Sequence, residues 1–166
     1  MNRLLLSLAA ALALATPAAA QTKLKWAHVY ETSEPYHTES VWAAEEIKKR
    51  TNGKFEIQVF PASSLGKETD INQGMQLGTV DMIISGPSFA ARSYPRLGIA
   101  YYPFILRDGD HLLAYSKSPV FKEMVDGFRE KTGIQILAYT YYGARHTTSK
   151  TTFTDCAGMK GLKIRV

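Results

Sequence analysis

Cysteine is nearly absent from this sequence, since Cys156 is the only one among 166 residues. A lone cysteine cannot form a disulfide within the chain, so the fold has to be stabilised by packing. It also excludes zinc sites built from paired cysteines. The four histidines, His28, His37, His111 and His146, show no metal-ligand spacing such as HExxH. The sequence therefore predicts no disulfide framework and no metal site.

The short motifs of nucleotide-binding and hydrolytic enzymes are missing as well. There is no glycine-rich phosphate loop, and the segment ISGPSF lacks the second glycine of a GxSxG nucleophile elbow. Nothing in the sequence marks the thiol of Cys156 as activated. We therefore expect a protein that is not an enzyme and needs no cofactor. An enzyme that uses His28 or Cys156 is the alternative from a different class of function.

Long runs of charge of one sign are also lacking. The formal net charge is +5, and the densest basic run is Lys48–Arg50. This run lies at the expected end of a helix, where cations interact favourably with the helix dipole. A modest and dispersed basic excess differs from the clustered basic patch of nucleic-acid-binding proteins. We expect no nucleic-acid partner.

A long apolar run occurs only at the N-terminus. Met1–Arg3 carry a positive charge, the stretch LLLSLAAALALA follows, and Ala18 and Ala20 give a small-x-small pattern before Gln21. The apolar stretch is too short to span a bilayer, and the whole pattern is typical of a secretory signal peptide. We expect residues 1–20 to be removed by cleavage between Ala20 and Gln21. The exported chain would then have no membrane-spanning segment.

Strand-like and helix-like segments alternate after residue 20. The pattern predicts strands over 23–30, 55–61 and 80–85, and helices over 33–53 and 68–77, with Gly78 as the cap of the second helix. Such alternation predicts parallel strands joined by right-handed helical crossovers, with ligands beyond the carboxyl ends of the strands. His28 and the segment Ser85–Phe89 lie at two of these ends.

The pattern beyond residue 100 predicts two further helices and two further strands. The helices cover about 110–117 and 119–131, and Gly133 stops the second. The segment IQILAYTYY, 134–142, is the longest strand candidate, and the polar segment GARHTTSK follows it with Arg145. The closing segment GLKIRV is predicted to be a strand. Its period of two places Arg165 on the face opposite Leu162, Ile164 and Val166.

Several of these segments, in this order, resemble the periplasmic solute-binding receptors of TRAP transporters. The resemblance rests on TNGKFEIQVFPASSLGKETD, QLGTVDM, YYPFIL, YGARHTTSK and MKGLKIRV. It implies an α/β, periplasmic-binding-protein-like clamshell of two lobes (type II-like). Residues 21–143 would form most of the first lobe, and residues 144–166 the crossover and the first strand of the second. The resemblance also implies a periplasmic receptor that binds a small organic acid, a mono- or dicarboxylate or a sugar acid, and delivers it to a membrane permease.

The resemblance further implies three ligand-binding residues. Arg165 would grip the ligand carboxylate, Arg145 would assist it, and Glu68 would reach the pocket. A guanidinium suits this task because its planar fork meets a carboxylate through two parallel hydrogen bonds and keeps its charge. His28 and Phe89 are additional candidates because of their positions near the ends of the first and third strands.

Each candidate also has a purely structural interpretation. Arg165 would be a solvated charge on an edge strand, and Arg145 a loop residue paired with a surface acid. Glu68 would be an acid in the first turn of a helix, where the dipole stabilises it. His28 would be a hydrogen-bonded structural histidine, and Phe89 a core aromatic.

The sequence departs from the family pattern at several positions. Gly86 and Phe89 stand where sialic-acid receptors of the family carry an acid and an arginine, which argues against sialic acid. Gly158 replaces the aspartate that usually precedes the arginine strand. Members of the family are about twice as long, as two domains require, so we expect a partial chain. The alternatives are an ABC-type solute-binding protein and a truncated fragment without function.

Overall fold

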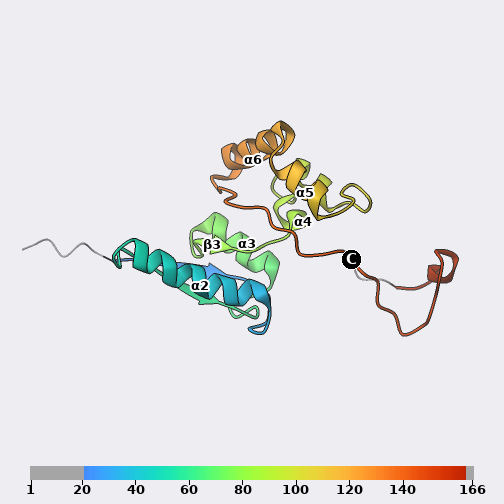
Figure 1. Ribbon diagram of the computed structural model, residues 1–166, viewed down its shortest axis with the longest axis horizontal. Coiled ribbons are helices and arrows are strands. Elements are labelled where there is room, and N and C mark those ends of the chain that lie inside the picture. Colours follow the sequence, from blue (N-terminus) through green and yellow to red (C-terminus); the bar gives the residue numbers. More distant parts are fainter. Residues whose placement is uncertain (1–20, 164–166) are drawn as a thin grey trace, which may run out of the picture.

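The computed structural model describes residues 21–163 (Figure 1). The predicted signal peptide, residues 1–20, and the predicted carboxylate anchor Arg165 lie outside the described residues. The elements are β1 (Thr22–Ala27), α2 (Pro35–Arg50), β2 (Phe55–Phe60), α3 (Glu68–Leu77), β3 (Met82–Ile83), α4 (Pro87–Ala90), the 3-10 helix η1 (Pro95–Tyr101), α5 (Gly109–Ser116), α6 (Pro119–Thr132) and the 3-10 helix η2 (Ala157–Met159). No helix within residues 21–163 combines the length and apolar character that crossing a bilayer requires.

The three strands form a parallel sheet with the order β2-β1-β3. Trp26 of β1 lies opposite Val59 of β2 on one side and Met82 of β3 on the other. The chain therefore moves outward from β1 to β2 and then returns across β1 to β3. The point where this direction reverses lies between the carboxyl ends of β1 and β3, which is where open α/β sheets bind ligands.

The two crossover helices cover opposite faces of the sheet. Ala27 lies opposite Phe60 and Ile83 in the register, so these side chains share one face. That face packs on Ile71 of α3, which together with Ala27 and Val80 forms a buried core. The α2 helix packs on β2 along the other face, and Figure 1 shows it lying along the sheet. Two right-handed crossovers in opposite directions require this arrangement.

A second core joins the helices of the chain's middle part. Leu97 of η1 packs against Met124 and Phe128 of α6, and all three side chains are buried. Glycines in the left-handed conformation end two helices, Gly78 after α3 with φ of 72° and Gly133 after α6 with φ of 74°. The predicted helices at 68–77 and 119–131 and their glycine caps are thereby confirmed.

The predicted strands are longer than the observed ones. β1 ends at Ala27, and β3 contains only Met82 and Ile83, although the apolar pattern predicts strands over 23–30 and 80–85. The prediction of a strand over 134–142 is wrong, because no residue there belongs to a strand. The predicted closing strand is likewise absent at residues 161–163, and its remaining residues lie outside the described part of the chain.

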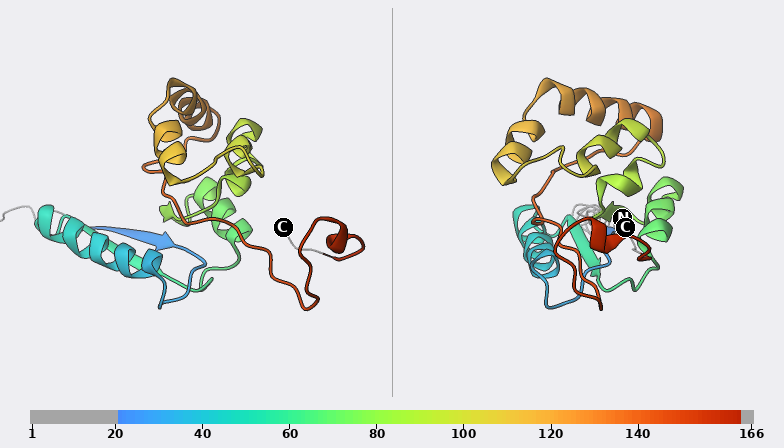
Figure 2. Two further views of the ribbon diagram at one scale, coloured as in Figure 1. Left: turned by 45° about the vertical axis from the view of Figure 1, so that its right-hand side comes forward. Right: turned by 90° about the vertical axis from the view of Figure 1, so that its right-hand side faces the viewer.

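The physical reason is that a strand needs a neighbour for its backbone hydrogen bonds. Within the described residues no strand pairs with 134–142, and Ile134 and Ile136 pack instead against the core of Leu97, Met124 and Phe128. This contact partly buries the alternate side chains of Ile134 and Ile136 without a sheet, whereas Leu137 is 77% exposed. Figures 1 and 2 show this segment leaving α6, passing the other helices and running on as an irregular chain to η2.

Candidate functional site

Three of the predicted ligand-binding residues lie around the carboxyl ends of β1 and β3. His28 directly follows β1, and the backbone N–H of Ile84 donates to the carbonyl oxygen of Ala27 at 3.3 Å, which joins the two strand ends. Glu68 is the first residue of α3, and Phe89 lies in α4 after β3. The structure therefore brings together candidates that lie up to 61 positions apart in the sequence.

Glu68 links α3 to the segment between β3 and α4. Its Oε1 atom accepts hydrogen bonds from the hydroxyl of Ser85 at 2.9 Å and from the backbone N–H of Gly86 at 2.7 Å. Asn72, one turn later in α3, donates from Nδ2 to the carbonyl oxygen of Glu68 at 2.7 Å and to the Ser85 hydroxyl at 2.9 Å. The carboxylate is thus held in place by donors, and it lies in no salt bridge among residues 21–163.

Gly86 lies between two of the candidates. A Cβ atom at this position would stand 3.9 Å from Oε1 of Glu68 and 3.9 Å from Cδ2 of Phe89. The ring of Phe89 is partly buried, and Cζ of Arg92 lies over it at 5.3 Å from the ring centroid. Glu68 and Phe89 therefore both border a position that carries no side chain.

His28 is 1% exposed and is paired with a second histidine. Its Nε2 atom lies 3.3 Å from Nδ1 of His37 in α2, so one ring nitrogen donates to the other. Its own Nδ1 is buried and has no hydrogen-bond partner among the described residues. Burial, and then the proximity of His37, lower the pKa of His28. The neutral imidazole is therefore favoured, and its Nε2 atom shares its hydrogen bond with His37.

Three tyrosines form a cluster beside His28, which we call the tyrosine cluster: Tyr30, Tyr36 and Tyr142. Tyr30 lies 4.7 Å from Tyr36 and 5.4 Å from Tyr142 between ring centroids. Tyr36 and Tyr142 are stacked at 5.1 Å with an angle of 10° between the rings. Burial, and then the charge of Glu68, raise the pKa of Tyr30. The tyrosine cluster therefore connects residues 30–36 to the segment just before Arg145.

Two hydrogen bonds hold that segment in place. The hydroxyls of Tyr36 and Thr140 lie 2.8 Å apart, and the Tyr142 hydroxyl donates to Oε2 of Glu34 at 2.7 Å. The second bond lowers the pKa of Glu34 and raises the pKa of Tyr142. The Glu34 carboxylate thus stabilises the folded state above its ordinary pKa of 4.5. This contribution is lost as the pH falls through the lowered pKa. The protonated hydroxyl of Tyr142 stabilises the folded state below its ordinary pKa of 10.0. This contribution is lost as the pH rises through the raised pKa.

We expect Glu34→Gln to lower the pKa of Tyr142 toward 10.0, because the substitution removes the charged acceptor of its hydroxyl proton. A titration of the tyrosine ring resonances by NMR measures this change. Glu31→Gln is the matched control, because it removes an exposed acid three positions away whose side chain takes no part in the bond. An unchanged Tyr142 pKa in Glu34→Gln contradicts the assignment of this hydrogen bond.

Arg145 contacts an aromatic ring of η1. Its side chain is exposed, and its Cζ atom stands over the ring of Tyr101 at 4.3 Å from the ring centroid. No salt bridge involves Arg145 among residues 21–163. The guanidinium is therefore in contact with an aromatic face and has no carboxylate partner within the described chain. Arg165, the other predicted arginine, lies outside the described residues.

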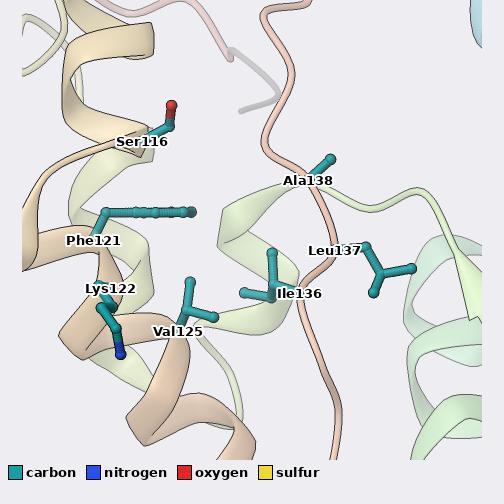
Figure 3. A pocket seen from close by; sticks show the side chains of 7 residues that line it. All are labelled: Ser116, Phe121, Lys122, Val125, Ile136, Leu137 and Ala138. Atoms are coloured by element: carbon teal, nitrogen blue, oxygen red, sulfur yellow. The ribbon is translucent and has the colours of Figure 1, made fainter.

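Two surface hollows occur away from the candidate residues. One, of about 200 Å³, is formed by the end of α5, by α6 and by residues after it, as Figure 3 shows; its lining residues are Ser116, Phe121, Lys122, Val125, Ile136, Leu137 and Ala138. The other, of about 370 Å³, lies between α2 and β2 and includes His37. Neither hollow is lined by any of the predicted ligand-binding residues.

Sequence reasoning missed several residues that the structure places at the site. Asn72 lies four positions after Glu68, a spacing that puts two side chains on one helix face, so helical periodicity alone could have indicated it. Tyr30 lies three positions after the end of β1 and two after His28, so its place just beyond a strand could have indicated it. Tyr142 and Tyr101 reach their partners only through the tertiary fold, and nothing in their local sequence shows the contact.

A comparison with protein families matches residues 26–166 to the family described as bacterial extracellular solute-binding protein, family 7. Among curated relatives, a solute-binding protein of Roseobacter denitrificans is 32% identical over 157 residues, which cover 95% of this chain and 48% of the relative. The chain spans about half the length of the curated relatives it matches.

Solved structures agree with the family match. A TRAP periplasmic solute-binding protein of Roseobacter denitrificans with bound L-galactonate has a TM-score of 0.61 at 32% identity, over 66% of this chain and 36% of that one. Another, from Haemophilus influenzae with bound L-gulonate, has a TM-score of 0.66 at 28% identity, over 72% and 39%. The predicted α/β periplasmic-binding-protein fold is thereby confirmed. The chain belongs to the TRAP-type bacterial extracellular solute-binding proteins of family 7.

Proposed function

We propose that the full protein is the periplasmic receptor of a TRAP-type secondary transporter, that it binds a small organic acid through Arg165 and Arg145, and that it delivers this acid to a membrane permease. The observation that supports the proposal best is the convergence of His28, Glu68 and Phe89 at the carboxyl ends of β1 and β3. This is the place where open α/β sheets bind ligands. Export by cleavage after Ala20 belongs to the same proposal.

Sugar acids are the ligand class that we propose first. The two similar solved structures hold L-galactonate and L-gulonate, and both compounds combine one carboxylate with a row of hydroxyls. The residues of this chain match such a ligand chemically. Two guanidiniums suit the carboxylate, whereas the carboxylate of Glu68 and the neutral imidazole of His28 suit hydroxyl groups, since one accepts and the other does either.

Lobe closure would complete the binding of the acid. In hinge-closing receptors the ligand is buried between two lobes, and closure presents a new surface to the partner. Residues 21–143 would supply the first lobe with Glu68, His28 and Phe89, and residues 144–166 would begin the second. Arg145 would then lie near the crossing between the lobes, where movement of one lobe changes its position relative to Glu68.

The test is a binding measurement on the full protein with L-galactonate and L-gulonate, by calorimetry and by thermal shift. We expect both acids to raise the melting temperature, because a ligand at 100 times its dissociation constant adds about 2.7 kcal/mol to the free energy of unfolding. Galactitol, which keeps the hydroxyls and lacks the carboxylate, is the matched control and should not bind. Equal binding of galactitol contradicts the arginine anchor, and a flat response to sugar acids and dicarboxylates alike contradicts the proposed function.

A further inference from the structure

We propose that Tyr101 is a positioning residue for Arg145, whose guanidinium it holds over its ring so that the N–H edges face the ligand carboxylate. The proposal rests on the proposed function, because it takes Arg145 as a contact of the acid. Tyr101 is the first residue of the segment YYPFIL, to which the sequence motifs and the family match give no role in ligand binding.

The side chain of Arg145 is in contact with the ring of Tyr101. Cζ of Arg145 lies over the Tyr101 ring at 4.3 Å from its centroid, well within the range of about 6 Å in which a cation is attracted to an aromatic face. A guanidinium is planar, and all of its N–H donors point outward in that plane. A ring against its face therefore leaves the donors available, and a carboxylate can still meet them through two parallel bonds.

The Tyr101 ring is carried by η1, which is packed against α6. Tyr101 is the last residue of η1, and its side chain is partly buried. η1 is fixed to α6 because Leu97 is buried against Met124 and Phe128. The ring therefore belongs to the packed body of the first lobe. A ring carried by a packed element is a suitable platform for a mobile cation.

The segment that carries Arg145 is exposed and irregular. Residues 141–150 are exposed throughout, and none of them belongs to a helix or a strand. Upstream, the segment is held by the bond from Tyr142 to Glu34 and by the stacking of Tyr142 on Tyr36. An arginine on such a segment has many rotamers, and ordering it on binding costs entropy. The Tyr101 ring removes part of that cost before the ligand arrives.

The proposal predicts a specific pattern of binding constants for L-galactonate, measured by calorimetry on the full protein. Tyr101→Leu should weaken binding about two- to fivefold, which is the strength of an exposed cation–π contact. Tyr101→Phe keeps the aromatic face and should bind as the unchanged protein does. Tyr102→Leu is the matched control, because it makes the same substitution at the exposed neighbouring tyrosine.

The decisive comparison is a double-mutant cycle with Arg145→Ala. If Tyr101 acts through the arginine, Tyr101→Leu has no further effect once Arg145 is alanine. An equal loss of affinity in the Arg145→Ala background means that the ring acts on the ligand or on the fold directly, and this result overturns the proposal. Unchanged affinity in Tyr101→Leu overturns it as well.

A second measurement keeps this proposal separate from the proposed function. In the free protein, the aromatic ring should shift the NMR resonances of the Arg145 side chain upfield, and this shift should persist in Tyr101→Phe and vanish in Tyr101→Leu. If the protein binds no organic acid, the proposed function fails, and the shift still decides whether Tyr101 positions the guanidinium. A shift that is absent from the unchanged protein overturns the proposal.

Discussion

Replacing Arg165 by alanine is expected to weaken the binding of L-galactonate by about 2 to 5 kcal/mol, the largest effect that we predict for a single ligand contact. Part of this loss comes from the ligand carboxylate, which would be buried without its partner. Arg165→Lys should retain some of the binding, because an ammonium keeps the charge but cannot form the two parallel bonds of a guanidinium. Calorimetry on the full protein measures both variants.

Lys163 provides the matched control for this prediction. It lies two positions before Arg165 and carries the same charge. If the arginine acts only through long-range attraction, Lys163→Ala and Arg165→Ala should weaken binding similarly, and added salt should remove both effects. If it is the anchor, Lys163→Ala changes little. Near-unchanged affinity in Arg165→Ala contradicts the anchor assignment.

Replacing Ile71 by alanine is expected to lower the free energy of unfolding by about 2 to 5 kcal/mol, because it leaves a cavity in the core. Ile71 is 1% exposed and packs against Ala27 of β1 and Val80 before β3. The loss therefore weakens the contact of α3 with the sheet that the same helix supports. Denaturant unfolding followed by circular dichroism measures the change.

Leu77→Ala is the matched control for Ile71→Ala, since it lies in the same helix and is 78% exposed. Its removal should change the free energy of unfolding by less than about 0.5 kcal/mol. Similar losses in the two variants would mean that α3 does not pack on the sheet through Ile71. At low temperature, where Ile71→Ala is still folded, the ligand affinity should stay close to that of the unchanged protein, because Glu68 keeps its bonds to Ser85 and Gly86.

The helices are predictable from the sequence because their signals are local. Gly78 and Gly133 end α3 and α6 where the pattern places them, in a left-handed conformation that glycine adopts without strain. Pro119 begins α6, after Ser118 whose side chain accepts the backbone N–H of Phe121. Each of these signals depends on a few neighbouring residues, so no knowledge of the tertiary fold is needed.

The strand at 134–142 shows the limit of such reasoning. Its alternating apolar residues satisfy the strand pattern, but an alternating pattern states only which side chains are buried, and not what buries them. Ile134 and Ile136 are partly buried against α6 and η1, and the backbone has no strand to pair with among the described residues. The candidate site has the same limit, because the sequence permits two interpretations of Glu68, as a binding residue or as an acid that the helix dipole stabilises.

The sequence by itself indicated the family, the alternation of helices with parallel strands, the places of His28 and Phe89 near the carboxyl ends of strands, and the place of Glu68 at the start of a helix. These properties follow from residue types at short spacing and from segments whose order is specific. The tertiary structure alone decided that Glu68 bonds to the β3–α4 segment, that Tyr142 reaches Glu34 across 108 positions, and that Arg145 lies over Tyr101. Such contacts join distant parts of the chain, and they depend on packing that no local pattern encodes.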